Sequence, residues 1–179
     1  MQTVCVFAGS ARVSPPEHEA LARELGTALA GAGFTVVYGA GSRGLMGTMA
    51  DAAVEGGARV IGVVPRGLFA AEDVHPGKIE LVEVDDLLER KRVMIELSDA
   101  FLALPGGLGT LDELVEVVTW AQLGLHSKPV FLLAAEGYWT PLLEWVDGAV
   151  ARGYVTTASR RLLQVIELAD VVDALASGG

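Results

Sequence analysis

The amino-acid sequence predicts an α/β fold in which helices flank a mainly parallel sheet. Short apolar runs, of the kind found in strands buried on both faces, recur along the chain. Segments with apolar residues at helical spacing lie between most of these runs, as crossovers between parallel strands require. A chain of 179 residues can bury roughly 70% of its unfolded surface. We therefore expect residues 1–179 to form a single domain, a Rossmann-like three-layer sandwich.

The expected elements follow one another in a regular order. Apolar runs predict strands at residues 3–8, 34–38, 59–64, 79–84, 100–104 and 129–134. Apolar residues at helical spacing predict helices at residues 17–32, 45–55, 86–98, 110–123 and 139–151. A weaker strand at 163–166 and a helix at 169–176 complete the expected fold.

Composition and charge exclude several classes of protein. The formal net charge is −10, which disfavours binding to nucleic acid or to an anionic membrane surface, because both are themselves negative. The single cysteine, Cys5, lies in an apolar run and predicts a core residue rather than a disulfide. The sequence starts without a basic leader, and no apolar run reaches the roughly 20 residues that span a bilayer. We therefore expect a cytoplasmic protein whose partner is a small molecule.

The stretch from Pro105 to Glu113 carries the strongest functional signal. It lies where a predicted buried strand ends and a helix begins, and it contains three glycines. Glycine allows the backbone to turn sharply and to approach a ligand, while the unpaired amides and the dipole of the new helix favour negative charge. The junction therefore predicts a phosphate-binding loop, which consists of Gly106, Gly107, Leu108, Gly109 and Thr110.

The loop after the first strand is expected at the same edge of the sheet, because the carboxyl ends of parallel strands face one way. It contains Gly9, Ser10 and Arg12, which offer a flexible turn, a hydroxyl group and a cation to a phosphate or a ribose. Small polar loops follow many strands, so a purely structural role is the alternative.

The second strand ends in residues 39–44, a G-x-G-x-x-G sequence whose last two glycines are Gly41 and Gly44. Dinucleotide sites usually add an acidic residue about 20 positions later, to hold a ribose. Here the next strand ends at Arg66 instead, and Asp51 comes too early. This favours a mononucleotide over NAD, with an oxidoreductase that uses a phosphorylated dinucleotide as a rival interpretation.

Three neighbouring cations on the helix at 86–98 are expected to differ in role. Arg92 has Glu89 three residues before it and Glu96 four after it, the spacing of surface ion pairs. Arg90 projects from a stripe that contains Leu87, Met94 and Leu97. A buried arginine needs an anionic partner, and Lys91 borders the same stripe and could reach the same anion. The alternative is that both side chains snorkel at the edge of the core.

Glu113 has two interpretations. Residues 110–113 form a capping-box sequence, in which Thr110 caps the helix and Glu113 reaches back to a backbone amide. Capping alone does not require three glycines immediately upstream, so the carboxylate could instead act at the edge of a nucleotide pocket. The residue types leave both roles open.

Other chemistries lack their parts in this sequence. His18, His75 and His126 are scattered without the spacing of metal ligands, so we expect no metal site. No G-x-S-x-G elbow is present, and Cys5 has no evident base.

Two motifs together resemble a known family. Residues 105–113 match P-G-G-x-G-T-x-x-E, and Arg90-Lys91 followed by Met94 matches R-K-x-x-M. Both are typical of Lonely Guy (LOG) proteins, which the chain resembles from Val4 to about Ala174. Further matches are Phe7–Ser10, Tyr38–Gly41, Gly44–Gly47 with Asp51, and Thr119–Gly124. The chain differs from the residues usual in the family at Ala11, Ala40 and Leu88, and these positions lie at the edges of the expected pocket.

The resemblance implies an enzyme. LOG proteins are cytokinin riboside 5'-monophosphate phosphoribohydrolases, formerly labelled as possible lysine decarboxylases. For this chain the resemblance implies hydrolysis of the N-glycosidic bond of AMP or of an N6-modified AMP, releasing adenine or a cytokinin base and ribose 5-phosphate. No lysine lies in a motif that marks a pyridoxal phosphate site, so decarboxylation is discounted and no cofactor is expected.

The resemblance also implies roles for individual residues. Arg90 and Glu113 would be the catalytic pair, and the protein would form a homodimer or a larger assembly. The nucleotide would be contacted by Glu72, Lys91, Thr119 and the residues from Gly107 to Thr110. The alternative is a non-catalytic nucleotide-binding protein on the same fold, similar to molybdenum cofactor carriers.

Overall fold

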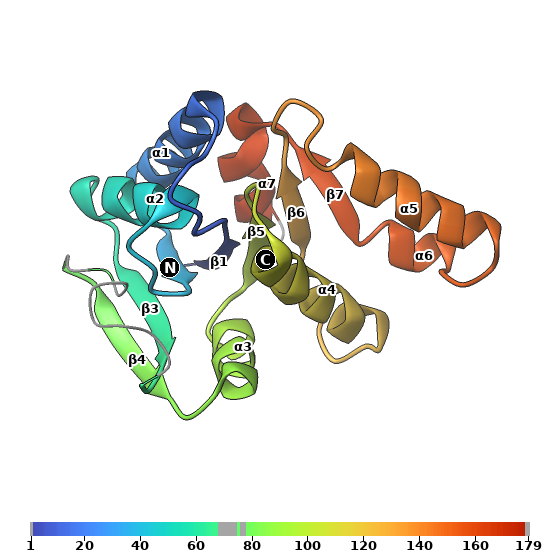
Figure 1. Ribbon diagram of the computed structural model, residues 1–179, viewed down its shortest axis with the longest axis horizontal. Coiled ribbons are helices and arrows are strands. Elements are labelled where there is room, and N and C mark those ends of the chain that lie inside the picture. The colour runs from blue at the N-terminus through green and yellow to red at the C-terminus, as the bar shows by residue number, and fades with distance from the viewer. Residues whose placement is uncertain (1, 68–74, 76–77, 178–179) are drawn as a thin grey trace.

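The computed structural model describes residues 2–67, 75 and 78–177, and its centre is a seven-stranded sheet (Figure 1). Every strand pair in it is parallel, and the strand order is β4-β3-β2-β1-β5-β6-β7. The strands are β1 (Thr3–Phe7), β2 (Thr35–Tyr38), β3 (Val60–Pro65), β4 (Glu80–Val84), β5 (Ala100–Ala103), β6 (Val130–Leu133) and β7 (Leu163–Ile166). The predicted α/β fold is therefore confirmed.

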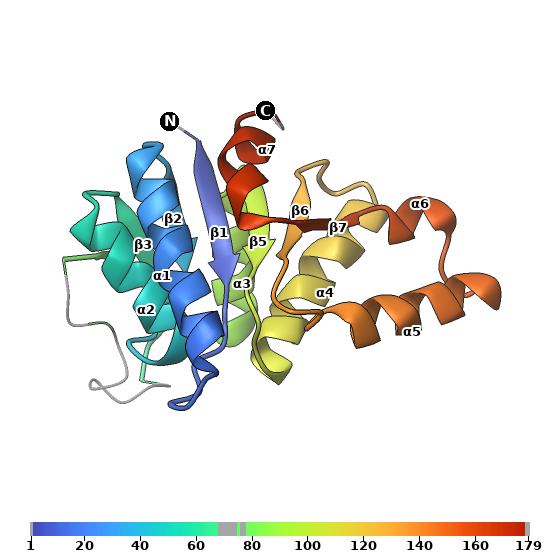
Figure 2. The ribbon, with the colours of Figure 1, turned by 90° about the horizontal axis from the view of Figure 1, so that it is seen from above.

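Helices cover both faces of the sheet and make the sandwich three layers thick. Alternating strand residues face opposite sides, so that Val4 and Val6 pack in one hydrophobic cluster while Cys5 and Phe7 pack in the other. The first cluster includes α1 (Pro16–Gly31), α2 (Gly44–Glu55) and α7 (Val171–Ser177). The second includes α3 (Leu87–Glu96), α4 (Leu108–Gln122) and α5 (Thr140–Ala151). Figure 2 shows α5 and the short α6 (Thr157–Arg160) at the end of the molecule opposite β3.

The direction of the strand order changes beside β1, and this change places the site. From β1 the chain builds outward through β2, β3 and β4, and then returns to place β5 on the other side of β1. In sheets of this type a ligand binds where the carboxyl ends of two such diverging strands separate. Gly9 after β1 and Pro105 after β5 meet there, since the Gly9 N–H donates to the Pro105 carbonyl at 3.0 Å.

The observed elements match the expected ones closely, with a few differences. α4 begins at Leu108 rather than at residue 110, which changes the role of the residues around Glu113. The short α6 was not predicted, because four residues carry too little periodicity to identify a helix. A 3-10 turn, Leu168–Asp170, precedes α7. Among the helices of the described residues, none is long and apolar enough to cross a membrane.

Candidate active site

A cavity of about 740 Å³ opens at the carboxyl edge of the sheet, over the junction of β1 and β5. The loops after β1, β2, β5 and β6 line it together with the first turn of α4. Its size is typical of a small-molecule site. Ten of the predicted site residues line this cavity: Gly9, Ser10, Gly41, Arg90, Gly106, Gly107, Leu108, Gly109, Thr110 and Glu113.

Four predicted site residues are not among the lining residues. Gly44 has φ +61°, and a β-carbon there would lie 2.5 Å from the Ala11 carbonyl oxygen. The glycine therefore lets the loop after β1 pack closely against the start of α2. Thr119 is exposed on α4. Lys91 lies between α3 and α4, with a side chain that is 12% exposed. Glu72 lies outside the described residues.

Arg90 is buried and held by main-chain carbonyls. Its Nε donates to the Val63 carbonyl at 3.1 Å, and its Nη2 donates to the Gly39 carbonyl at 3.0 Å. Its Nη1 lies 3.6 Å from Glu113 Oε1, and the exposed fractions of these two side chains are 10% and 9%. Burying a guanidinium without such partners would be very costly, so the contacts fix its position. The predicted anionic partner of Arg90 is therefore Glu113.

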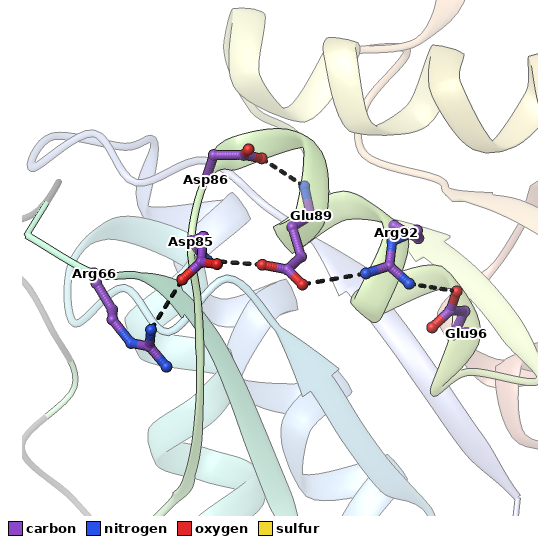
Figure 3. Close-up of polar contacts among 6 residues, drawn as sticks. All are labelled: Arg66, Asp85, Asp86, Glu89, Arg92 and Glu96. Carbon is purple, nitrogen blue, oxygen red and sulfur yellow. Dashed lines mark hydrogen bonds and ion pairs between the residues drawn. The ribbon is translucent and has the colours of Figure 1, made fainter.

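Side-chain hydrogen bonds hold the first turn of α3, which contains Arg90 (Figure 3 shows the bond between Asp86 and Glu89). Asp86 caps the helix, since its carboxylate accepts the Glu89 N–H at 2.8 Å. The Glu89 carboxylate accepts the Asp85 N–H at 2.8 Å, so both ends of the turn are held. This arrangement closely resembles a capping box. One residue later, Arg90 points at the sheet.

The other charges of this region lie on the surface. Arg92 pairs with Glu89 at 3.2 Å and with Glu96 at 3.0 Å, as its spacing predicted (Figure 3). Arg66, which the dinucleotide interpretation would need, pairs with Glu83 at 3.4 Å and Asp85 at 2.9 Å, and it is 63% exposed. Arg66 also does not line the cavity, which leaves the dinucleotide interpretation without its cation.

Glu113 does not belong to a capping box, and that expectation is wrong. The N-cap of α4 is Gly107, with φ −90° and ψ −153°. The capping box would require Thr110 at this position, which lies three residues earlier in the sequence. Thr110 is buried within the first turn, and its hydroxyl group packs tightly against Gly106. A β-carbon at position 106 would lie 2.1 Å from the Thr110 hydroxyl oxygen. Glu113 therefore stands in the second turn, and its side chain lines the cavity beside Arg90.

Burial makes Glu113 an unusual acid. It raises the pKa of the carboxyl group from 4.5 to about 7, although Arg90 acts in the opposite direction. A buried carboxyl group that titrates near neutral pH in a cavity is typical of a functional site.

Lys91 has its own partners. Its Nζ lies 2.6 Å from a Glu116 carboxylate oxygen and 3.1 Å from one of Asp112, both on α4. These hydrogen bonds raise its pKa against the effect of burial. The residue thus joins α3 to α4 and does not line the cavity.

The glycine loop is compatible with an anion. The first backbone amides of a helix have no partner inside it, and those of Leu108 and Gly109 donate to no acceptor among the described residues. Ala40, which lines the same cavity, takes φ +61°, a strained conformation for alanine of a kind that clusters at functional sites.

Residue-type reasoning missed two aromatic rings at the cavity. His18 at the start of α1 and Tyr138 after β6 both line it, and their rings meet edge to face at 5.9 Å. The structure places Tyr138 there because β6 lies next to β5 and its carboxyl-end loop shares the same edge of the sheet, whereas the sequence does not reveal which strands are neighbours. Arg12, in contrast, does not line the cavity, although Arg43 does. Among the described residues, no group of three or more His, Cys, Asp or Glu side chains could hold a metal ion.

Comparison with known proteins decides the family. A protein-family model described as "Possible lysine decarboxylase" matches residues 46–175. The cytokinin riboside 5'-monophosphate phosphoribohydrolase LOG1 of Arabidopsis thaliana is 46% identical over 160 residues, covering 89% of this chain and 75% of that protein. The chain belongs to the LOG family. Its resemblance to LOG proteins is therefore confirmed.

Other relatives agree with the LOG assignment or with the fold. The enzyme LOG of Oryza sativa subsp. japonica is 45% identical over 160 residues, covering 89% of this chain and 66% of that protein. The molybdenum cofactor binding protein from Rippkaea orientalis superposes with a TM-score of 0.73 over 98% of this chain and 96% of its own. It is 21% identical, so this likeness shows a shared fold alone.

Proposed function

We propose that this LOG-family protein hydrolyses the N-glycosidic bond of adenosine 5'-monophosphate or an N6-modified form of it. The products are the free base, adenine or a cytokinin, and ribose 5-phosphate. The identity of 46% to a named phosphoribohydrolase over most of the chain is the observation that carries the proposal. The buried pair Arg90 and Glu113 in the cavity supports it.

The geometry suggests a division of labour. The amides of Gly107, Leu108 and Gly109 bind the 5'-phosphate at the start of α4. The bond between ribose C1' and the base nitrogen breaks, and C1' gains positive charge. The oxygen of a water molecule then bonds to C1', and a proton from that water passes to the base nitrogen. The Glu113 carboxylate stabilises that charge or orients the water, and Arg90 holds the carboxylate in place.

A passive carrier on the same fold is the weaker alternative. A protein that only binds a phosphate gains nothing from a buried carboxylate beside its anion, because the two negative charges repel. Glu113 lines the cavity and is 93% buried, with a relative exposure of 7%. The Arg90 and Glu113 pair therefore favours the hydrolase.

The test is a product assay. The purified protein is incubated with AMP and with an N6-prenylated AMP, and the products are separated chromatographically. Free base and ribose 5-phosphate should appear in equal amounts, and adenosine, which lacks the 5'-phosphate, should react far more slowly. Release of a nucleoside and inorganic phosphate, or no release of base from either nucleotide, would refute the proposal.

The pH dependence of the reaction should follow the ionisation of Glu113. Its pKa of about 7 means that the charged form grows as pH rises through neutrality. If the charged form is the active one, kcat/KM should rise about tenfold per pH unit below 7 and level off above pH 8. A substrate phosphate titrates lower, near 6. The residual activity of Glu113→Gln should lack the inflection at 7, and a wild-type profile that falls through this range would contradict the assignment.

We further propose a cytoplasmic protein in which residues 1–179 form one nucleotide-binding domain and pair as a homodimer or larger homo-oligomer. Apolar side chains are 46–71% exposed on α3 and at α4, which Lys91 joins: Leu87 and Leu88 on α3, Val115 on α4, and Leu123 directly after it. Such exposed apolar side chains are typical of an interface. Size-exclusion chromatography with light scattering measures the mass of the assembly, and Leu88→Glu should lower this mass.

A further inference from the structure

The loop between β6 and α5 turns Tyr138 toward the glycine loop. Glu136 and Gly137 both adopt left-handed backbone conformations, with φ of +48° and +78°. Such a conformation is costly for a glutamate and persists only where the surroundings impose it. The Tyr138 N–H donates to the Ala135 carbonyl at 2.8 Å, which closes the turn.

Tyr138 and its neighbour Trp139 are sent in opposite directions. Trp139 is buried, and its Nε1 donates to the Leu133 carbonyl at 3.1 Å. Tyr138 stays 42% exposed and lines the cavity. Its ring meets the edges of His18 and Trp139, at centroid distances of 5.9 and 5.1 Å. The two rings hold the phenol in place, so that its hydroxyl group has a defined direction.

The hydroxyl of Tyr138 donates a hydrogen bond to the Gly106 carbonyl, 32 residues away in sequence. The preceding carbonyl, that of Pro105, is held by the N–H of Gly9 at 3.0 Å. The carbonyls of Pro105 and Gly106 are therefore anchored, one by the β1 loop and the other by Tyr138. The two peptide planes that contain these carbonyls are held in place while these bonds persist.

Anchoring the Gly106 carbonyl also orients the next amide. In a trans peptide the C=O and the following N–H point in opposite directions, so the Gly106 carbonyl fixes the direction of the Gly107 N–H. Gly107 is the N-cap of α4, and both residues of this peptide are glycines, whose backbones are the freest to rotate. Without the tyrosine hydroxyl this peptide would have to be ordered by the ligand itself, which weakens binding.

We infer that Tyr138 is a positioning residue, which holds the Gly106–Gly107 peptide so that the start of α4 is ready for the substrate's phosphate. The inference deepens the proposed function and rests on it for the identity of the ligand. It assigns Tyr138 to binding and not to the bond-breaking step, because its hydroxyl is engaged by the loop.

Tyr138→Phe tests this inference, because it removes the hydroxyl group and keeps the ring. The loss of one such bond should raise both the KM for AMP and the Kd for ribose 5-phosphate about five- to tenfold, with kcat changed less than twofold. The Kd is measured by titration calorimetry. Tyr154→Phe is the matched control, since Tyr154 is 85% exposed outside the cavity, and it should leave both constants unchanged.

The outcomes separate this inference from the proposed function. If the wild type releases base and Tyr138→Phe binds ribose 5-phosphate as tightly as the wild type does, the inference is wrong and the function stands. A variant that melts earlier at unchanged Kd and KM would likewise reduce Tyr138 to a structural role. If the wild type releases no base but the variant binds ribose 5-phosphate more weakly, the proposed reaction fails and the positioning role stands.

Discussion

Replacing Glu113 by glutamine is expected to slow release of the base roughly 100-fold or more. Glutamine keeps nearly the same shape but carries no charge, so it cannot stabilise the positive charge that develops on the ribose. It also leaves the Arg90 guanidinium, 3.6 Å away, as an unbalanced cation beside that developing charge. Initial rates of base formation at pH 8 measure the effect, because the wild-type carboxyl group is ionised there.

The control for this variant is Glu24→Gln, an exposed position on α1 outside the cavity. It should retain wild-type rates. Circular dichroism and the binding of ribose 5-phosphate establish that Glu113→Gln is folded with an intact phosphate loop. A folded Glu113→Gln protein that releases base at a near-normal rate would remove Glu113 from the mechanism.

Gly39→Ala is expected to lower kcat/KM about 100-fold by displacing Arg90. A β-carbon at position 39 would lie 1.8 Å from Arg90 Nη2, which is the end of a flexible side chain. The fold can therefore adapt, but the guanidinium has to leave the Gly39 carbonyl and move relative to Glu113. Since Arg90 holds the pKa of Glu113 down, its displacement should also shift the rise in the pH profile to higher pH.

Gly31→Ala is the matched control for that substitution. A β-carbon at Gly31 meets no atom within 4 Å, and its φ lies outside the left-handed range. Steady-state kinetics between pH 6 and 9 should distinguish the two variants. A Gly39→Ala protein with an unchanged rate and an unchanged pH profile would show that the position of Arg90 does not matter.

The fold followed from the sequence because strands buried on both faces must be apolar and parallel strands must be separated by crossovers. Strand β7 agrees with the expected residues 163–166, although its apolar run is weak. The order of the strands needed the structure, since the apolar runs do not record which strands pair.

The candidate site was predicted where residue types carry the chemistry. A glycine loop, an arginine on a partly apolar stripe and a carboxylate after the loop pointed to one pocket, and the cavity contains all three. The anchors of Arg90 could not be predicted, because the carbonyls of Val63 and Gly39 belong to the main chain and leave no mark on the residue type.

Local geometry bears on two points that the sequence left open. In the capping-box interpretation Thr110 caps the helix, but α4 begins earlier, with Gly107 as its N-cap, and Thr110 therefore lies within its first turn. For Lys91 the sequence left open a contact with the ligand or a place at the edge of the core, and in the structure its ammonium group pairs with Asp112 and Glu116 on the facing helix. That pairing depends on how α3 packs beside α4, which spacing within one helix cannot reveal.

Arg90 is anchored by the main-chain carbonyls of Val63 and Gly39, and these two positions differ in their tolerance of sequence change. Every amino acid presents the same carbonyl, so the bond at position 63 survives any apolar replacement that keeps β3 in register. At position 39 only glycine leaves room for the guanidinium. A library that varies Val63 among apolar residues while preserving Gly39 and Gly62 can therefore change the packing of β3 without displacing the arginine.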